Sequence, residues 1–385
     1  MTGPRPLVVA EQLRRRVPGG IGTYVSSLTG ALVAAGTEVT LWASRPPRGR
    51  SPGAPPPDRV ATLGTTRVTS ALPSRALVAA WDRGWAGPPP GFDVVHATSL
   101  AVPPAGRAPM TVMVHDLAWR RAPETFPERG RRWHEAALGR ALARASLLLT
   151  PSRLTADDLV LAGAPASKVE VVEEGCDHLP PPDHAGADAL RAALGIEEDY
   201  LLTVSTIEPR KNLERLVAAY GQARARLPHP AQLVVVGPAG WGGDLSPRPG
   251  VVMAGHVEEP AVLAGLYVRA RLVVSVPLVE GFGLPAVEPM ALGTPVVASP
   301  QPSTGGAAYE VDPHDVGSIA DGLTRVATDE ALRADLVAAG RERAARLTWS
   351  AAADHHRQLW ADLASTGPTG PAGPPAGRRR SSAGD

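Results

Sequence analysis

The sequence predicts two α/β domains in tandem, each a doubly wound, Rossmann-like parallel sheet with helices on both faces. Short apolar runs alternate with stretches of helical spacing along most of the 385 residues. The alternation pauses at residues 180–189, PPPDHAGADA, which are expected to form a linker, and then restarts. A chain of this length also favours about two domains. We therefore expect one domain over residues 1–182, a second over 183–349, and a ligand cleft between them.

The first domain is expected to begin with a strand, a glycine loop and a helix. The apolar run PLVVA precedes the loop GGIG (19–22), and a helical pattern follows around residues 24–34. Residues 45–60 are rich in Pro, Gly and Arg and are expected to form a flexible surface loop. Helical spacing returns at residues 131–146. The strands expected in this domain are 6–10, 38–44, 93–98, 110–116, 147–152 and 168–175.

The second domain repeats the pattern. Helices are expected over residues 212–227 and from about Pro285 to Gly293. Sheets of this kind bind ligands at the carboxyl ends of their strands, so the polar residues that follow the strands are the candidates for a site. From residue 366 onward the chain is rich in Gly and Pro, and a disordered tail is expected over 366–385. The strands expected in this domain are 200–206, 232–238, 251–255, 272–278 and 294–299.

Composition limits the class of protein. The single cysteine, Cys176, allows no internal disulfide and favours a reducing compartment. The N-terminal arginines follow the short apolar run LVVA, which is the wrong order for a signal peptide. No segment reaches the roughly 18 uninterrupted apolar residues of a membrane-spanning helix. These features predict a cytoplasmic protein.

Charge is unevenly distributed, although the net charge is only +1. Residues 1–182 contain 21 Lys and Arg against 15 Asp and Glu, whereas the remainder contains 18 against 23. The excess of basic residues in the first half has two explanations. One is peripheral contact with an anionic surface, such as the inner membrane face. The other, which is simpler, is that the arginines are scattered and solvated. Aromatic residues make up 4% and form no strip with the arginines, so nucleic-acid binding is not predicted.

Several common active-site signatures are absent from the sequence. It has no GxxxxGK[ST], HExxH or CxxC motif, and no strand ends in a DxD that would chelate a metal-bound nucleotide. The GxSxG motif is also absent, so a hydrolase triad has no anchor. No metal site is expected.

Two candidate sites lie in the first domain. GGIG precedes a helix, where glycines let the backbone approach an anion, although a plain turn is the simpler interpretation. The motif VHD ends the strand 110–116, and its His115 can donate or accept hydrogen bonds in a cleft. Asp116 would orient His115 or cap the following segment. Hydrogen bonds to the local backbone explain this pair equally well.

The motif EPRKN (208–212) ends a strand and opens a helix in the second domain. Arg210 and Lys211 would then lie at a helix N-terminus, where cations oppose the helix dipole. A bound diphosphate would remove the conflict, with Arg as a fork and Lys as a point charge. Lys211 is one of only two lysines among 39 basic residues, which favours a specific need for an ammonium group. The alternative is a solvated charge pair.

The segment EGFGLPAVE (280–288) follows the strand 272–278. Gly281 and Gly283 permit a tight turn with exposed amides. Glu288 is expected in the first turn of the following helix, where a carboxylate stabilises the dipole. Glu280 precedes the turn at the carboxyl end of the strand, and its carboxylate is well suited to a pair of sugar hydroxyls.

Together these motifs resemble those of the retaining, nucleotide-sugar-dependent glycosyltransferases of family 4, which have the two-domain GT-B fold. The resemblance covers nearly the whole chain to about residue 365, and the ordered set is highly specific. The motifs are GGIGTY, VHD, LLTPS, EGCD (174–177), EPRKN, VVVGPAGWGG, AGHV (254–257) and EGFGLPAVEPMALGTPVVAS.

The resemblance implies a role for individual residues. Glu280 and Glu288 match the E-x7-E motif, of which the first contacts the donor sugar and the second the ribose. Arg210 and Lys211 match the basic pair that neutralises the diphosphate leaving group. His115 matches a strand-end histidine near the donor sugar.

Further donor contacts are implied in both domains, with the base against the backbone of residues 255–257. A C-terminal helix, about 350–365, would cross back to the first domain. The remaining implied donor-binding positions are Gly19, Gly20, Gly22, Thr206, Gly255, His256, Val257, Gly281, Phe282, Gly283 and Leu284.

The chain departs from the family pattern in places that bear on donor geometry. Ser205 and Thr206 stand where many members have Gly-Arg, so Arg210 is the arginine left to serve the phosphates. Pro289 replaces a usual alanine. The segment that follows VVAS, around residues 300–310, is about four residues shorter than usual and lacks the common Pro-Glu.

The implied activity is transfer of a sugar, mannose or glucose, to a glycan, lipid-linked or small-molecule acceptor, as in polysaccharide biosynthesis. GDP-mannose or UDP-glucose would be the co-substrate, and no other cofactor is expected. Two alternatives stay open. One is a nucleotide-sugar epimerase or phosphorylase of the same architecture, and the other is a non-catalytic relative that binds nucleotide sugars.

Overall fold

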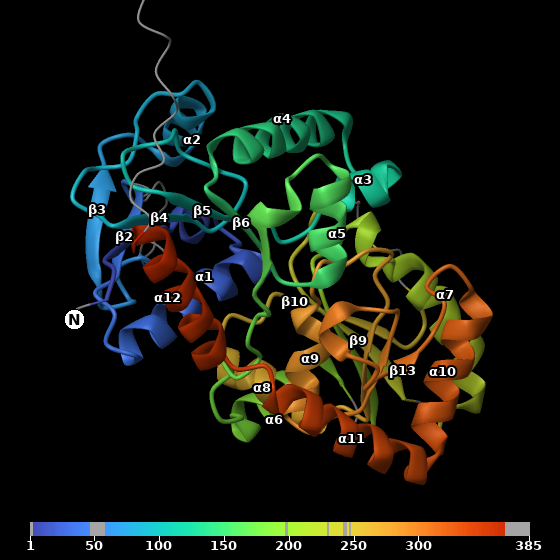
Figure 1. Cartoon of the computed structure of the whole chain (residues 1–385). Coiled ribbons are helices and arrows are strands. Elements are labelled where there is room, and N and C mark those ends of the chain that lie inside the picture. Colours follow the sequence, from blue (N-terminus) through green and yellow to red (C-terminus); the bar gives the residue numbers. More distant parts are fainter. Residues whose placement is uncertain are drawn as a thin grey trace, which may run out of the picture.

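The computed structural model describes residues 3–46, 58–196, 199–228, 231–241, 245 and 248–365. Two α/β domains with parallel sheets make up this part of the chain, as the sequence predicts (Figure 1). Most of the predicted 45–60 loop and the predicted tail, 366–385, lie outside the described residues.

The first domain contains a seven-stranded sheet with the order β3-β2-β1-β4-β5-β6-β7, in which all neighbouring strands are parallel. Its central strands are buried along their length, which is the pattern of a sheet covered on both faces. The strands are β1 (Pro6–Val9), β2 (Thr40–Ser44), β3 (Thr66–Ser70), β4 (Val94–Ala97), β5 (Met110–Met113), β6 (Leu147–Thr150) and β7 (Val169–Val171). The helices are α1 (Gly19–Ala34), α2 (Ser74–Asp82), α3 (Ala118–Arg121), α4 (Glu128–Arg144) and α5 (Arg153–Leu161).

The second domain contains a six-stranded parallel sheet with the order β10-β9-β8-β11-β12-β13. The strands are β8 (Tyr200–Val204), β9 (Gln232–Val236), β10 (Val251–Gly255), β11 (Leu272–Ser275), β12 (Val296–Ala298) and β13 (Tyr309–Glu310). The helices are α6 (His184–Leu194), α7 (Leu213–Ala223), α8 (Pro260–Arg269), α9 (Leu284–Ala291), α10 (Val316–Thr328) and α11 (Glu330–Ala345).

Helices cover both faces of the second sheet because each presents one apolar face. In α7 the buried residues Leu213, Leu216, Val217 and Tyr220 follow the spacing of three and four that places side chains on one side of a helix. They pack with α10 against one face of the sheet. Side chains of α8 and α9 pack against the other face, and this is the face from which the site is built.

The structure corrects several expectations. The strand β3 was missing from the predicted pattern because its sequence, TRVTS, is an exposed edge strand with one apolar residue. The GGIG motif is not a loop, since α1 begins at Gly19. The predicted linker, 180–189, is partly helix α6, whose first turn is capped by a hydrogen bond from the Gly186 amide to Asp183 Oδ1 (2.9 Å). The strand β13 and the helix α2 also had no predicted counterpart.

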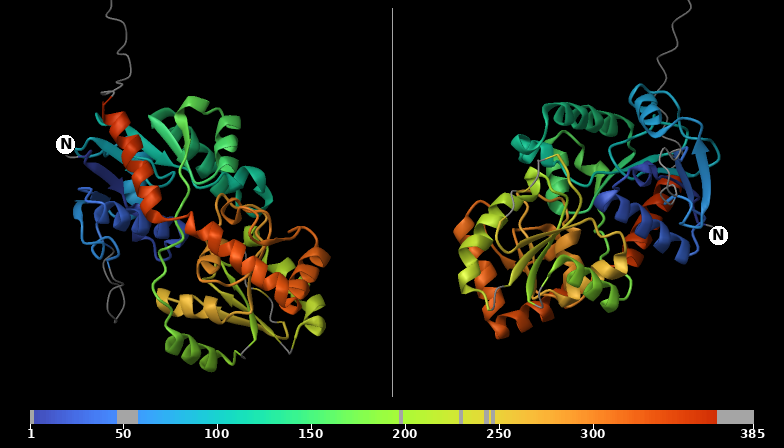
Figure 2. Two further views of the ribbon diagram at one scale, coloured as in Figure 1. Left: turned by 60° about the horizontal axis from the view of Figure 1, so that its bottom comes forward. Right: turned by 180° about the vertical axis from the view of Figure 1, so that it is seen from behind.

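Two stretches of chain connect the domains, and they lie side by side (Figure 2). The first leaves β7 and leads to α6, and the second joins α11 to α12 (Trp349–Ser365). The Cys176 amide donates to the carbonyl of Leu347 at 2.9 Å, and the Trp349 amide donates to Asp177 Oδ1 at 2.8 Å. A methyl group on Gly175 would lie 2.3 Å from the Trp349 nitrogen, so this close crossing requires glycine.

The helix α12 crosses to the first domain and packs against α1. Trp349, Ala353 and Trp360 are buried in the core formed by α1 and the strands β1 and β2. The hydroxyl of Tyr24, on α1, lies 2.9 Å from the Nε2 atoms of both His96 and His356, so a polar contact joins α12 to the centre of this domain.

The chemistry of the outer partners fixes the direction of these hydrogen bonds. His356 Nδ1 lies 2.7 Å from the carbonyl of Ala352, which only accepts, so Nδ1 carries the proton and Nε2 accepts from Tyr24. Tyr24 therefore accepts from His96 Nε2, and His96 Nδ1 accepts from the Thr111 hydroxyl at 2.8 Å. The indole N–H of Trp360 donates to Thr111 Oγ1 at 3.2 Å. Every member of this chain is satisfied when both histidines are neutral.

Acid is therefore expected to destabilise the protein through these two histidines. Burial lowers the pKa of His356 to about 4 and that of His96 well below its ordinary value. The unfolded chain takes up protons at these residues below about pH 6.5, whereas the folded chain resists them, so stability falls as the pH falls. From His356 alone, the free energy of unfolding should decrease by about 3 kcal/mol between pH 7 and pH 4.

Guanidinium denaturation at a series of pH values measures this effect. The variant His356→Gln should be less stable at pH 7 but should show a shallower decline toward pH 4. An unchanged slope in the variant would show that other groups cause the acid sensitivity.

Candidate functional site

The carboxyl ends of β8 and β11 form the switch point of the second sheet, because the chain proceeds outward from this pair in opposite directions. Such a point leaves a crevice in which α/β proteins bind ligands. The 3-10 helix Pro209–Lys211 follows β8, and Glu280 follows β11. The structure thus brings together Arg210, Lys211 and Glu280, three of the predicted site residues.

Glu280 links the two cations. Lys211 Nζ donates to Glu280 Oε2 at 2.7 Å, and Arg210 Nη1 donates to the same oxygen at 3.2 Å. Arg210 Nη2 also donates to Glu208 Oε1 at 2.9 Å, and Nη1 donates to the carbonyl of Val279 at 3.1 Å. Arg210 Nε is buried and has no partner in the described part of the chain. The cations are therefore neutralised from within the protein, and one N–H of Arg210 is left unused.

The predicted conflict between Arg210, Lys211 and a helix dipole does not arise as expected. Asn212 adopts the left-handed conformation, with φ of 60°, and separates the basic pair from α7. Carboxylates on both sides, Glu208 and Glu280, compensate the two cations instead.

Electrostatics keep the cluster ionised. Burial by itself raises the pKa of Glu280, but Lys211 and Arg210 outweigh burial, so this pKa lies below its ordinary value. Burial likewise opposes the charge of Arg210, and the carboxylates Glu280, Asp116 and Glu208 reverse the effect and raise its pKa. Burial raises the pKa of Glu208. Glu280 therefore stays an anion at neutral pH. Its carboxylate and a bound phosphate would compete for the same two cations.

Gly281 lies at one of the contacts between the two domains. A methyl group on this residue would lie 1.8 Å from the carbonyl oxygen of His115 and 2.8 Å from Asp116 Cβ. The hydroxyl of Ser152, at the start of α5, donates to the Gly281 carbonyl at 2.6 Å. The turn that follows Glu280 is therefore held directly against the carboxyl end of β5.

His115 faces this contact, and both of its ring nitrogens have partners. Nε2 lies 3.0 Å from the carbonyl of Thr98, and Nδ1 lies 3.0 Å from Glu174 Oε1. Burial alone lowers the pKa of His115, but the hydrogen bond and charge of Glu174 outweigh burial and raise it. Both partners are acceptors, so the arrangement favours an imidazolium that donates from both nitrogens. His115 is therefore oriented as a fixed cation.

The start of α9 offers free backbone donors. Gly283, with φ of 107°, precedes the helix, and its carbonyl accepts from the Ala286 amide at 3.0 Å. The amides of Phe282, Gly283 and Leu284 donate to no described group. They lie at the positive end of the helix dipole and can bind an anion or a hydroxyl oxygen.

The glycines of GGIG lie opposite this helix end. A methyl group on Gly20 would lie 3.9 Å from Leu284 Cδ1, which places the start of α1 across the cleft from the start of α9. A methyl group on Gly22 would lie 2.2 Å from Pro18 Cβ, so this glycine is required by local packing. Gly19 has a φ of 62°. Two helix N-termini thus face the same space between the domains.

Glu288 does not lie in the first turn of its helix, as the sequence suggested, because α9 begins at Leu284 and Glu288 is in the second turn. It is 8% exposed. The Tyr267 hydroxyl donates to its Oε2 at 2.8 Å, and His178 Nε2 lies 3.2 Å from its Oε1. Glu288 therefore does not stabilise the dipole of α9 from its first turn. Its carboxylate is buried, and each of its oxygens has one partner.

The segment around residues 300–310, which was expected to be shorter than usual, contacts the glycine turn at residues 281–283. The Ser303 amide donates to the Phe282 carbonyl at 3.1 Å, and the Ser303 hydroxyl donates to the Gly283 carbonyl at 2.8 Å. Pro289 lies inside α9 and has no N–H to donate, whereas its carbonyl accepts from the amides of Leu292 (3.1 Å) and Thr294 (2.9 Å). The shortened segment thus holds the glycine turn in place.

The predicted base-binding positions lie at the end of the edge strand β10. Gly255 has a φ of 69°, and its carbonyl accepts from the Gly237 amide at 2.8 Å. His256 is exposed and Val257 is half-buried. Thr206 lies after β8, where its Cγ2 would be 2.9 Å from a methyl group on Gly240. Within the described residues, no hydrogen bond or ion pair joins them to Lys211 or Glu280.

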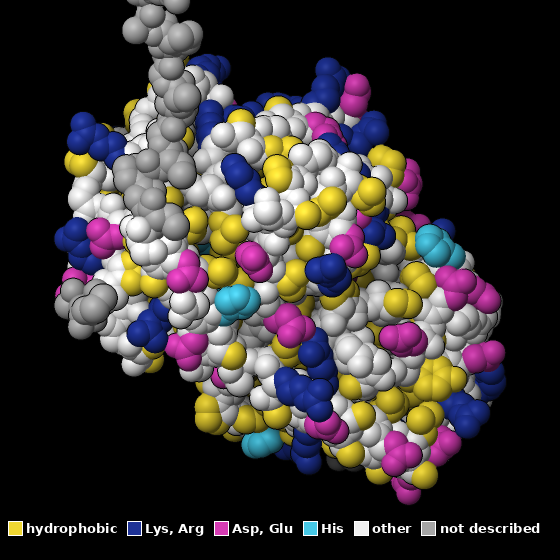
Figure 3. All heavy atoms as spheres, in the orientation of Figure 1, with side chains coloured by type: hydrophobic (Ala, Val, Ile, Leu, Met, Phe, Trp, Pro, Cys, Tyr) yellow, Lys and Arg dark blue, Asp and Glu magenta, His cyan; other side chains and the backbone are white. Residues whose placement is uncertain are grey.

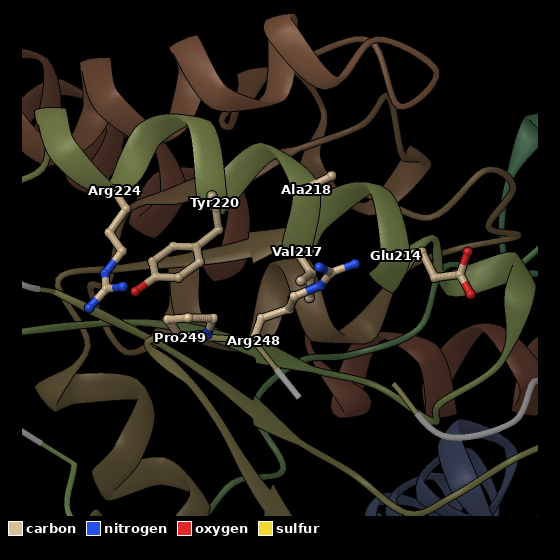
Figure 4. Close-up of a pocket in the computed structure, with 8 residues that line it drawn as sticks. Glu214, Val217, Ala218, Tyr220, Arg224, Arg248 and Pro249 are labelled. Carbon is tan, nitrogen blue, oxygen red and sulfur yellow. The ribbon is translucent and has the colours of Figure 1, made fainter. Parts of the chain in front are cut away.

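Other features of the described chain lie apart from this cluster. A pocket of 440 Å³ lies between α7 and residues 248–250, where Arg224 extends beside the Tyr220 hydroxyl (Figure 4). None of the predicted site residues lines it. No group of three or more His, Cys, Asp and Glu is arranged to hold a metal within the described ranges. Among the helices described, none has the length and apolar character needed to span a membrane.

Several residues at the site were not given a role from the sequence. Glu174 belongs to the EGCD motif and Ser152 to LLTPS, and both motifs were recognised without assigning functions to these side chains. Glu208 stands beside the basic pair within EPRKN. No local pattern marks Tyr267 or His178, which reach Glu288 from α8 and from the connection between the domains.

Comparison with known proteins identifies the family. Residues 18–178 match the profile of Glycosyltransferase Family 4, and residues 187–343 match that of Glycosyl transferases group 1. O-antigen chain mannosyltransferase B of Escherichia coli is 30% identical over 254 residues, which are 61% of this chain and 65% of that protein. A D-inositol 3-phosphate glycosyltransferase of Stackebrandtia nassauensis is 33% identical over 336 residues, which are 77% of this chain and 74% of that protein.

Solved structures share the fold at lower identity. HepE of Anabaena, solved in complex with UDP and glucose, has a TM-score of 0.67 at 17% identity and covers 93% of this chain and 100% of that one. WaaG, a glycosyltransferase involved in lipopolysaccharide biosynthesis, has a TM-score of 0.58 at 15% identity over 92% of this chain and 99% of that one. With two matching profiles and a relative 33% identical over most of its length, the chain belongs to family 4 of the glycosyltransferases, with the GT-B fold.

Proposed function

We propose that the protein is a hexosyltransferase that moves mannose or glucose, with retention of configuration, from a nucleoside-diphosphate sugar to an acceptor held on the first domain. The observation that carries this proposal is the cluster of Lys211, Arg210 and Glu280 beside the start of α9. Its buried Arg210 Nε and the amides of residues 282–284 are donors without partners in the described structure. Such a set of unused donors is suited to a diphosphate and to sugar hydroxyls.

The proposed mechanism relies on exchange of partners at Glu280. When the diphosphate binds, its oxygens take over Lys211 Nζ and Arg210, and the Glu280 carboxylate turns to the hydroxyls of the donor sugar. The two cations then neutralise the charge that develops as the diphosphate leaves. His115, fixed by Thr98 and Glu174, contributes a positive charge close to the sugar rather than a free base.

The donor is proposed to be GDP-mannose, with UDP-glucose the second candidate. Similarity to a mannosyltransferase favours mannose, and the fold shared with HepE, which was solved with UDP and glucose, supports the second candidate. The ribose would be held by Glu288, and the base would lie against residues 255–257.

The acceptor is proposed to be a glycan, a lipid-linked saccharide or a small molecule, as in polysaccharide biosynthesis. The positive excess of residues 1–182 supports a cytoplasmic enzyme with peripheral contact to the anionic inner face of the membrane. On the face shown in Figure 3, basic and acidic side chains are interspersed, so such a contact would be weak there.

Two other functions remain as alternatives to be tested. A nucleotide-sugar epimerase or phosphorylase would yield products that do not require an added sugar acceptor. A non-catalytic relative would bind the nucleotide sugar without turnover across an acceptor panel. Product analysis with and without acceptor, with the anomeric configuration read by NMR, distinguishes these outcomes from retaining transfer.

A thermal-shift screen of nucleoside diphosphates should identify the base. We expect GDP to raise the melting temperature most and UDP next, because a ligand that binds only the folded state stabilises it more the lower its Kd at a given concentration. Equal shifts with all bases would contradict recognition of the base at residues 255–257.

Removal of the Lys211 ammonium should abolish most of the activity. In Lys211→Ala we expect turnover of the donor to fall by about 100-fold, the effect of removing one preorganised charge from a transition state. Release of nucleoside diphosphate from GDP-mannose or UDP-glucose measures it. Lys168→Ala provides the matched control, because Lys168 is exposed on the first domain and should leave turnover unchanged. Normal turnover in Lys211→Ala would disprove the site assignment.

Neutralising Glu280 should have opposite effects on product binding and on transfer. Because its carboxylate occupies Lys211 and Arg210, Glu280→Gln should bind the free nucleoside diphosphate about tenfold more tightly, the size of one charge-assisted hydrogen bond. Turnover should fall, since the contact to the sugar is weakened. Calorimetric titration and steady-state kinetics measure the two effects. Weaker binding of the free nucleoside diphosphate by the variant would rule out the exchange of partners.

A further inference from the structure

Glu288 is fixed from two directions by side chains that the family resemblance does not assign. The Tyr267 hydroxyl from α8 donates to Oε2, and His178 from the connection between the domains lies against Oε1. The side chain of His178 is 14% exposed and that of Glu288 is 10% exposed, so the contact is largely shielded from water. Contacts of this kind hold a carboxylate in one orientation.

The tautomer of His178 follows from its other neighbour. The indole N–H of Trp349, at the start of α12, points to His178 Nδ1 at 3.3 Å. An indole nitrogen can only donate, so His178 Nδ1 accepts and the proton of the neutral ring is on Nε2. That proton is on the nitrogen which lies 3.2 Å from Glu288 Oε1. Trp349 therefore favours the tautomer in which the protonated nitrogen of His178 is the one that lies 3.2 Å from Glu288 Oε1.

Trp349 is itself held where the two connections between the domains cross. Its amide donates to Asp177 Oδ1 at 2.8 Å, and its ring packs edge-on against Tyr24 at 6.0 Å between centroids. Tyr24 in turn packs edge-on against His115 at 5.0 Å. The orientation of Glu288 is thus tied to the arrangement of both domains rather than to α9 alone.

We propose that His178 is a positioning residue for ribose recognition: held by Trp349, it orients Glu288 so that its carboxylate accepts hydrogen bonds from the ribose hydroxyls of a nucleoside diphosphate. This inference rests on the proposed function, in which Glu288 contacts the ribose. His178 lies apart from Lys211 and Glu280, and its contribution is to binding of the nucleoside, not to departure of the diphosphate.

The experiment compares ribonucleotides with analogues that lack the ribose hydroxyls. Calorimetric titration of wild type with GDP, UDP and their 2′,3′-dideoxy forms should show tighter binding of the ribo form of the preferred base. In His178→Leu the affinity for that ribo form should fall about tenfold, the size of one hydrogen bond to a charged group, and the affinity for the dideoxy form should stay unchanged. In the transfer reaction, the same variant should raise KM for the donor and leave kcat within about twofold.

Two further variants separate positioning from a general structural effect. His178→Gln keeps an N–H donor and should recover most of the preference for ribose. His184→Leu is the matched control, because His184 is exposed at the start of α6, six residues after His178, and should behave as wild type.

The outcomes discriminate between the two levels of the proposal. Equal loss of affinity for ribo and dideoxy forms in His178→Leu, or an unchanged ratio, would overturn the role of His178 and leave the transferase proposal standing. Failure of wild type to bind either GDP or UDP would overturn the proposed function and this inference with it.

Discussion

The arrangement of the site depends on the absence of a side chain at residue 281. The His115 carbonyl occupies the position that a methyl group on Gly281 would need, so the turn after β11 can approach the carboxyl end of β5 only as glycine. This contact fixes the distance between the sheets. It brings the start of α9 opposite the start of α1. Ser152, which donates to the Gly281 carbonyl, holds the same contact from the other domain.

Charge balance explains why such a cluster is stable without a ligand. Buried cations without partners would be costly, and Glu208 and Glu280 supply those partners for Arg210 and Lys211. In the proposed mechanism a diphosphate displaces Glu280, because it offers the same cations more negative charge than one carboxylate. Glu280 thus holds the two cations in fixed positions before an anion binds. Charges fixed in advance are what electrostatic stabilisation of a leaving group requires.

Much of the fold follows from the sequence, and the exceptions have physical causes. The buried strands have continuous apolar runs and were located from them, whereas β3 is exposed and β13 has two residues, so neither leaves a pattern. Motif order indicated Lys211, Arg210 and Glu280, which the structure brings together. The partners of Glu288 and His115 could not be found this way, because His178, Tyr267 and Glu174 lie far from them in sequence. Whether Glu288 falls in the first or the second turn of α9 depends on where the helix begins. Glycine and proline locate that residue in the sequence only approximately.

The two connections between the domains show how movement and rigidity can coexist. Cys176 and Asp177 cross the start of α12 through one backbone hydrogen bond and one bond from the Trp349 amide to the Asp177 carboxylate, and the buried hydrogen bond between Tyr24 and His356 ties that helix to the first domain. The crossing also packs against the second domain, since Cys176 lies in its core and Arg343 of α11 donates to Glu173. Rotation of the second domain about it would change the distance between Gly281 and His115. A rotation that also moved the crossing relative to α9 would change the contact of His178 with Glu288, the carboxylate that the proposed function assigns to the ribose.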